Sequence, residues 1–141
     1  MKTLATNEDK VWPQQDWPAM RFKKGLKVGS YGGHGIVRYT VEQFIEGKYI
    51  KFRFSKPKGF NGFHDFEIIE INNEKTELIH TIQMETKGLA IFSWIFAIRW
   101  LHDALIEDAF DNVENYFSEN NKRTKWNPWV KFLRFIFKLI R

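Results

Sequence analysis

The chain has 141 residues and a formal net charge of +5 at pH 7, and 17% of its residues are aromatic. This length suits one domain with a single core and excludes a second full domain. The absence of cysteine excludes disulfides, thiolate metal sites and cysteine nucleophiles. The sequence has no apolar run of about 18 residues, and Met1–Trp12 lacks an apolar signal segment, so we expect a cytoplasmic protein.

The stretch from Val11 to Ser30 is interrupted by Trp12-Pro13, Trp17-Pro18, Gly25 and Gly29. Proline and glycine at this spacing favour short helical turns or a loop over a long helix or strand.

Between Gly35 and Thr86 the apolar residues recur with a period of two, which predicts strands. Ile36–Phe44 and Lys48–Ser55 flank Glu46-Gly47, a tight-hairpin signal. The expected facing pairs are Tyr39 with Phe54, Val41 with Phe52, and Glu42 with Lys51. One face of this hairpin is then apolar and the other is charged, as in a sheet with one solvated side.

A second hairpin is expected from Phe63–Ile71 and Thr76–Thr86 around the turn Asn72–Lys75. With Ile71 opposite Thr76, the facing pairs are Ile69 with Leu78, Glu67 with His80, Asp65 with Ile82, and Phe63 with Met84. We expect this mostly apolar face to point inward, although it carries Asp65, Glu67 and His80. A slip of one residue would turn these three polar groups outward.

The last large element is a helix from Gly88 toward Phe117, because apolar residues recur every three or four positions. Its second half has an acidic outer face of Asp103, Glu107, Asp108, Asp111 and Glu114. Asn127-Pro128 then predicts the start of a second helix, with Asn127 as the N-cap. We expect a domain at 1–121 and a separate basic helix at 122–141.

The elements predict an α+β fold in which a long C-terminal helix lies across a curved antiparallel sheet. The runs GGHGIVRYTVEQFIEGKYIKFRFSKPKGFNGFHDFEIIEI, TELIHTIQMETKG and WLHDALIEDAFDNVENYF, with the early Val11-Trp12-Pro13 and Trp17-Pro18, resemble the SRPBCC superfamily. That superfamily comprises START-like, birch-allergen-like helix-grip proteins, including polyketide cyclase-type members. The resemblance covers residues 8 to 118 and is specific for fold rather than activity, and the short N-terminal region leaves little room for the first strand and helix pair of the family.

The resemblance implies a cavity between sheet and long helix that binds an apolar small molecule or a lipid, without a cofactor. A cavity of this kind is apolar with a few placed polar groups, which fits the excess of aromatic residues. The candidate lining residues are Tyr39, Phe52, Phe54, Phe63, Met84, Trp94, Ile98, Leu101 and Leu105.

An alternative function is that of a cyclase or dehydratase. Glu67 facing His80, with Asp65 two residues away, would make an acid/base pair, because a carboxylate orients a neighbouring imidazole. A buried ion pair without a catalytic role is the commoner outcome of such a pattern. The four histidines and the acids show no recognised spacing for a metal, so no metal site is expected.

The positive charge of the chain is concentrated at its C-terminus, where residues 122–141 hold seven Lys and Arg and no acid, against 15 cations and 17 anions elsewhere. On a helical wheel, at about 100° per residue, cations form one stripe and apolar residues fill most of the rest. The candidate partner or membrane residues are Trp129, Lys131, Phe132, Leu133, Arg134, Ile136, Lys138 and Arg141.

Besides packing against its own domain, this tail helix could bind three partners: a membrane surface, a second copy in a homodimer, or nucleic acid. Cations close to an anionic membrane contribute on the order of 1 kcal/mol each. Nucleic acid fits poorly, since the cations lie opposite the aromatic residues, whereas single-strand binders present both on one surface. We expect most of the apolar face to be buried against protein, with peripheral membrane association as the alternative.

Overall fold

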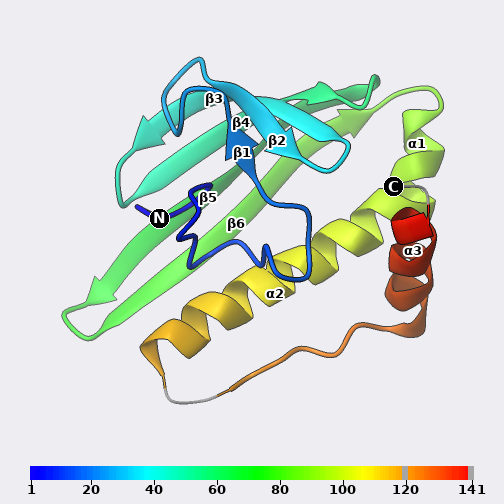
Figure 1. Cartoon of the computed structure of the whole chain (residues 1–141). Helices are drawn as coiled ribbons and strands as arrows, with labels where there is room; N and C mark the ends of the chain where they lie inside the picture. Colours follow the sequence, from blue (N-terminus) through cyan, green and yellow to red (C-terminus); the bar gives the residue numbers. More distant parts are fainter. Residues whose placement is uncertain (119–120, 140–141) are drawn as a thin grey trace.

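The computed structural model describes residues 1–118 and 121–139. It contains one six-stranded antiparallel sheet whose strands lie side by side in chain order, with the long helix α2 across one face (Figure 1). The strands are β1 (Arg21–Phe22), β2 (Tyr31–His34), β3 (Val37–Ile45), β4 (Tyr49–Lys56), β5 (Phe60–Asn72) and β6 (Lys75–Thr86). The predicted α+β architecture of a curved sheet, a long helix and an extra terminal helix is confirmed.

The register of β3 and β4 agrees with the prediction near the middle of the hairpin. Tyr39 lies opposite Phe54 and Val41 opposite Phe52, but an irregularity after Val41 places Gln43, not Glu42, opposite Lys51. Glu42 nevertheless accepts a hydrogen bond from Arg53 at 2.6 Å. The inner members Tyr39 and Phe52 are fully buried and form part of the core.

The register of β5 and β6 differs from the prediction by one residue. At the turn, Asn72 pairs with Lys75, which matches the expected alignment, but an irregularity at Ile71 shifts the ladder so that Glu70 pairs with Thr76. One extra residue in a strand exchanges the faces of everything beyond it. The expected pair Glu67–His80 is therefore wrong, and His80 lies opposite Phe66.

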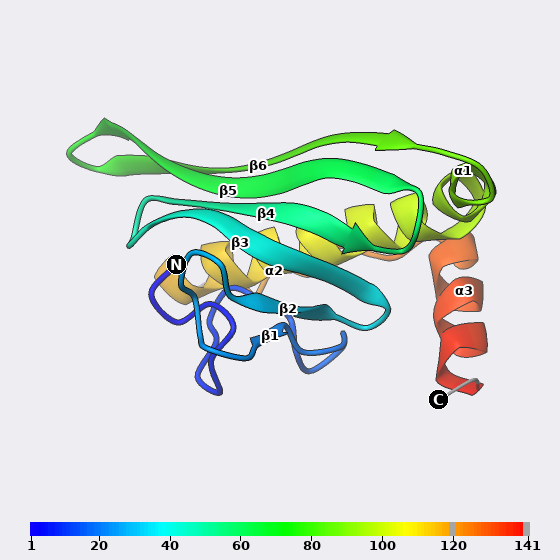
Figure 2. The same ribbon diagram turned by 90° about the horizontal axis from the view of Figure 1, so that it is seen from above.

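The predicted long helix is confirmed. It runs continuously through α1 (Ala90–Ser93), a π-helical turn η1 (Trp94–Ile98) and α2 (Arg99–Phe117). The terminal helix α3 (Pro128–Leu139) begins where expected, because the Asn127 side chain accepts a hydrogen bond from the Val130 amide at 2.9 Å. Seen from above, α3 stands beside α1 at one end of the molecule (Figure 2).

The N-terminal segment, residues 1–20, has no helix or strand but closes one side of the core. It buries Leu4, Val11, Trp12, Trp17 and Met20. The predicted loop at 11–30 is correct in character, although its middle contains the short strand β1, paired with β2. Gly32 allows this pairing, since a Cβ there would collide with the Arg21 carbonyl oxygen and the Phe22 side chain.

The acidic outer face expected on α2 is wrong at two positions, since Asp108 and Asp111 are buried. The segment 121–127 runs back along α2 and covers them (Figure 1). Asp108 accepts hydrogen bonds from the indole nitrogens of Trp17 at 2.6 Å and Trp126 at 2.9 Å. Asp111 accepts one from the Thr124 amide at 2.5 Å. These carboxylates tie the N-terminal segment and the tail to the same helix.

Candidate functional site

A cavity of about 630 Å³ lies between the sheet and the helices. Apolar walls come from β3, β4, β5, β6, the π-helical turn and α2, through Val37, Phe54, Phe60, Ile82, Trp94, Ile98, Leu101 and Leu105. Its volume falls within the range of small-molecule sites. Exposed residues border its open side, including Gln15, Asp16, Ile36 and Lys138.

Five of the nine predicted lining residues border this cavity: Phe54, Trp94, Ile98, Leu101 and Leu105. Tyr39 and Phe52 are instead fully buried in the core. Phe63 lies on the other face of the sheet, where the Lys51 ammonium sits 3.6 Å from its ring centroid, and Met84 is not among the lining residues. The misplacement of Phe63 follows from the shifted register of β5.

All four histidines of the chain gather beside the cavity, although they come from β2, β5, β6 and α2. The rings of His64 and His80 lie 5.4 Å apart and those of His80 and His102 lie 5.0 Å apart. His34 and His64 both contact Tyr39. His34, His64 and His102 line the cavity.

Two imidazole nitrogens in this cluster are buried without a hydrogen-bond partner in the described part of the chain: Nε2 of His64 and Nε2 of His102. Their other nitrogens are engaged, because His64 Nδ1 lies 3.2 Å from His80 Nε2 and His102 Nδ1 lies 3.3 Å from an Asp103 carboxylate oxygen. The Tyr39 hydroxyl is likewise buried without a partner among these residues. Buried polar atoms are normally hydrogen-bonded, so each of these atoms retains the capacity for a further hydrogen bond.

Burial keeps three of these histidines, His34, His64 and His80, uncharged at neutral pH. Burial and the nearby His102 and Arg38 lower the pKa of His34 to about 3. Burial and the nearby His102 lower the pKa of His80 to about 3, although Asp103 acts in the opposite direction. Burial and the three other histidines hold the pKa of His64 well below its usual value. These three histidines therefore offer neutral donors and acceptors rather than cations.

The three catalytic candidates do not come together. His80 shares the inner face of the sheet with His64 and Phe66, whereas alternation along β5 places Asp65 and Glu67 on the opposite face. Asp65 there accepts a long hydrogen bond from the Tyr49 hydroxyl at 3.4 Å. The facing pair that suggested acid/base catalysis is absent from the described residues.

The tail residues divide into two groups. Leu133 is buried, Ile136 is half-buried, and the Arg134 guanidinium lies over the rings of Trp17 and Trp126, at 4.1 and 4.3 Å from their centroids. Trp129, Lys131, Phe132 and Lys138 are exposed. Arg141 lies outside the described residues. The expectation that protein covers most of the apolar face is thus wrong for Trp129 and Phe132.

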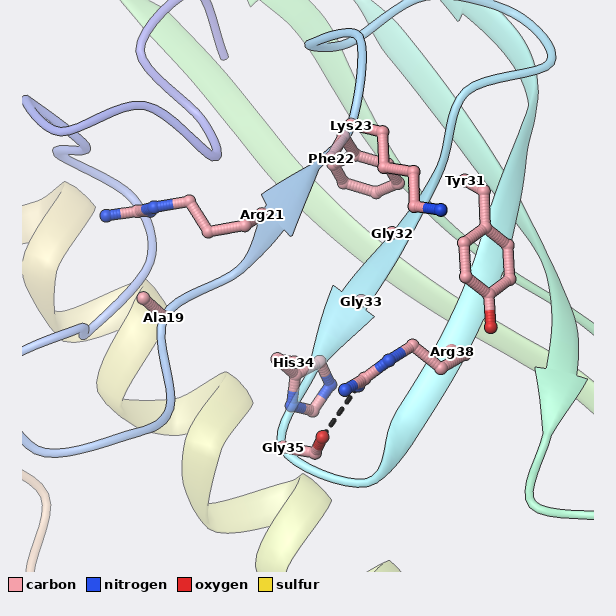
Figure 3. A pocket seen from close by; sticks show the side chains of 10 residues that line it. All are labelled: Ala19, Arg21, Phe22, Lys23, Tyr31, Gly32, Gly33, His34, Gly35 and Arg38. Atoms are coloured by element: carbon pink, nitrogen blue, oxygen red, sulfur yellow. Dashed lines mark hydrogen bonds between the residues drawn. The ribbon is translucent and has the colours of Figure 1, made fainter.

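A second, shallower pocket of about 410 Å³ lies at the edge of the sheet formed by β1 and β2 (Figure 3). Arg21, Lys23 and Arg38 border it, and Arg38 donates to the Gly35 carbonyl oxygen at 2.6 Å. His34 also belongs to its lining and so separates the two pockets. Because Arg38 is already engaged with the turn between β2 and β3, we assign this pocket no ligand.

Neither a metal site nor a membrane-spanning helix is found in the part of the chain that the structure describes. Within the described ranges, no three His, Cys, Asp or Glu side chains are grouped as metal ligands, and no helix is long and apolar enough to cross a membrane. No known family model, curated protein or solved structure matches the chain. The cavity, with its histidines, is therefore the candidate site on geometry alone.

Sequence reasoning missed the three histidines that line the cavity, because they are far apart in the chain. His80 was predicted on the inner face and lies there, whereas strand alternation places His64 inward only in the register that the irregularity at Ile71 sets. His34 and His102 come from other elements, and no spacing in the sequence links them.

Proposed function

We propose that this protein binds and carries an apolar small molecule or lipid in the cavity between sheet and helices. The observation that carries the proposal is the cavity of about 630 Å³ with mostly apolar walls. Mostly apolar pockets with a few polar groups are the usual sites for such ligands. The resemblance to helix-grip proteins and the cytoplasmic location remain predictions from the sequence.

Narrowing the cavity from both walls tests this function. We expect the double variant Ile82→Trp/Leu101→Trp to bind the neutral fluorophore N-phenyl-1-naphthylamine at least about tenfold more weakly than the wild-type chain, because large side chains from β6 and α2 then fill the ligand volume. Fluorescence titration measures the dissociation constants. The matched control Thr81→Trp/Tyr116→Trp adds the same rings to β6 and α2 at exposed positions. Equal affinity of both double variants would contradict the proposal.

A second function, docking on a membrane surface, is favoured by an exposed aromatic patch on α1, η1 and α3. The helices α1 and α3 lie at the same end of the molecule (Figure 2). The patch consists of Phe92, Phe96, Trp129 and Phe132, which are 42 to 60% exposed. The Trp129 indole donates to the Phe96 carbonyl oxygen at 3.0 Å, and its ring stacks on Phe132. Large exposed aromatic patches usually mark partner or membrane sites.

The charges around this patch favour an anionic bilayer over a second copy of the chain. Residues 86–102 and 121–138 contain no acid, whereas they carry Lys87, Arg99 and the basic residues of the tail. Two such surfaces would repel each other in a homodimer, but both would be attracted to anionic lipid. The cavity is bordered by Trp94, Ile98 and Phe137 from the same helices, so docking would bring its open side near the lipid.

A charge placed in the patch tests this docking. We expect Phe132→Glu to reduce sedimentation with vesicles of phosphatidylcholine and phosphatidylserine by about tenfold. The change replaces an aromatic ring that would be buried in the lipid with a carboxylate that the anionic headgroups repel. The control Phe117→Glu makes the same change at an exposed position at the far end of α2. Unchanged sedimentation of Phe132→Glu would contradict docking. A concentration-dependent dimer that Phe132→Glu dissociates would show that a second copy occupies the patch instead.

A further inference from the structure

The polar side chains of the cavity define what kind of ligand group can bind there. Beyond apolar carbon, the lining includes two histidines from different elements, His64 on β5 and His102 on α2, and each has a buried Nε2 without a partner among the described residues. His64 is only 3% exposed. Leaving such atoms unsatisfied costs stability, whereas a ligand that supplies the missing hydrogen bonds recovers that cost.

The bonds that these residues already make determine which atoms remain for a ligand. The Asp103 carboxylate can only accept, so Nδ1 of His102 carries a proton, and in the neutral imidazole Nε2 then carries a lone pair. His64 Nδ1 shares one hydrogen with His80 Nε2. His64 Nε2 is then a donor when His80 supplies that hydrogen, and an acceptor when His64 does. The wall thus offers one fixed acceptor and one nitrogen that can adapt.

A hydroxyl group matches this pair, because it donates one hydrogen bond and accepts others. A hydrocarbon ligand satisfies neither nitrogen. A carboxylate has no hydrogen to donate to the His102 lone pair and meets no cation at His34, His64 or His80, which are neutral at pH 7. The cations that border the cavity, Arg134 and Lys138, come from α3 rather than from this wall.

We propose that His64 and His102 form a polar subsite that binds a neutral hydroxyl group of an otherwise apolar ligand. The subsite rests on the proposed function, because it orients the ligand within the same cavity. It makes this protein selective for apolar alcohols or phenols over hydrocarbons and over fatty-acid-like anions. His80 acts as a positioning residue, since it holds the His64 ring through Nδ1.

The selectivity is tested with three probes of one shape: 2-naphthol, naphthalene and 2-naphthoate. We expect the ratio of the naphthalene to the naphthol dissociation constant to fall by about tenfold in His64→Phe and in His102→Phe, because each loses a hydrogen bond to the hydroxyl and little volume. Comparing ratios cancels differences in the hydrophobicity of the probes. Gln83→Phe on β6 is the control, since it places the same ring at an exposed position outside the cavity lining, and its ratio should equal that of the wild-type chain.

A second readout does not depend on the variants. The ¹⁵N resonance of His102 Nε2 should move toward that of a hydrogen-bonded nitrogen when 2-naphthol is added, and stay unchanged with naphthalene. Equal ratios in the wild-type chain and all variants, with naphthalene still bound, would overturn the subsite and leave the carrier function intact. Tightest binding of 2-naphthoate would also overturn it. Binding of none of the probes would overturn the carrier function together with the subsite.

Discussion

Lowering the pH from 7 to 5 is expected to reduce the free energy of unfolding by about 4 kcal/mol through His34 and His80 alone. Both have a pKa of about 3 in the folded chain, whereas an unfolded histidine titrates near 6.5. Between these values the unfolded chain binds more protons than the folded one, so stability falls as the pH falls. Each residue contributes about 2 kcal/mol over this interval, and His64 adds an effect of the same sign.

Urea unfolding at pH 7 and pH 5 measures this loss. The variant His34→Phe removes one of the two groups while keeping a ring against Trp12 and Tyr39. It should lose about 2 kcal/mol less than the wild-type chain between the two pH values. A free energy of unfolding that stays constant from pH 7 to pH 5 would show that these histidines are solvated. It would contradict the claim that the histidines beside the cavity are buried and neutral.

Replacing Asp108 by alanine is expected to destabilise the fold by about 2 to 4 kcal/mol, because it leaves two indole N–H groups without an acceptor. Trp17 comes from the N-terminal segment and Trp126 from the segment before α3, and both donate to one carboxylate oxygen of Asp108. Arg134 lies over both rings and donates to the Asp16 carbonyl oxygen. Loss of the Asp108 carboxylate therefore loosens both the N-terminal segment and the segment before α3.

The control for this variant is Asp103→Ala on the same helix. The Asp103 side chain is exposed, and so are its contacts with Arg99 at 4.0 Å and His102 Nδ1 at 3.3 Å, so its removal should cost less than about 0.5 kcal/mol. Thermal unfolding compares the two variants, and proteolysis followed by mass spectrometry locates cleavage near residues 1–20 and 121–127. Equal stability of both variants would mean that the buried carboxylate does not hold these segments.

The order of elements was predictable from the sequence because it depends on local signals. Period-two strands, the Glu46-Gly47 turn and the three-and-four spacing of the long helix each act over a few residues. The Asn127 cap was equally local, and its hydrogen bond to Val130 lies where the sequence predicts it. These features depend on neighbours in the chain, and the structure contains them all.

The site was less predictable because it depends on registers and on distant segments. One irregularity at Ile71 exchanged the faces of β5 and so brought His64 inward while it turned Glu67 outward. The sequence predicted Asp108 to be a solvated acid on the helix surface, because it does not reveal that residues 121–127 return along α2 and bury this side chain. Trp129 and Phe132 read as residues to be buried, yet the body of the domain covers only one side of α3.

The central claim is that the cavity holds an apolar ligand, and mass spectrometry of the protein purified without detergent and extracted into organic solvent tests it most directly. We predict close to one apolar compound bearing a hydroxyl group per chain in wild-type protein and in Thr81→Trp/Tyr116→Trp, and its loss from Ile82→Trp/Leu101→Trp. An extract with no such compound from protein that also fails to bind N-phenyl-1-naphthylamine would contradict the account. The same amount of compound from the narrowed variant would contradict it equally.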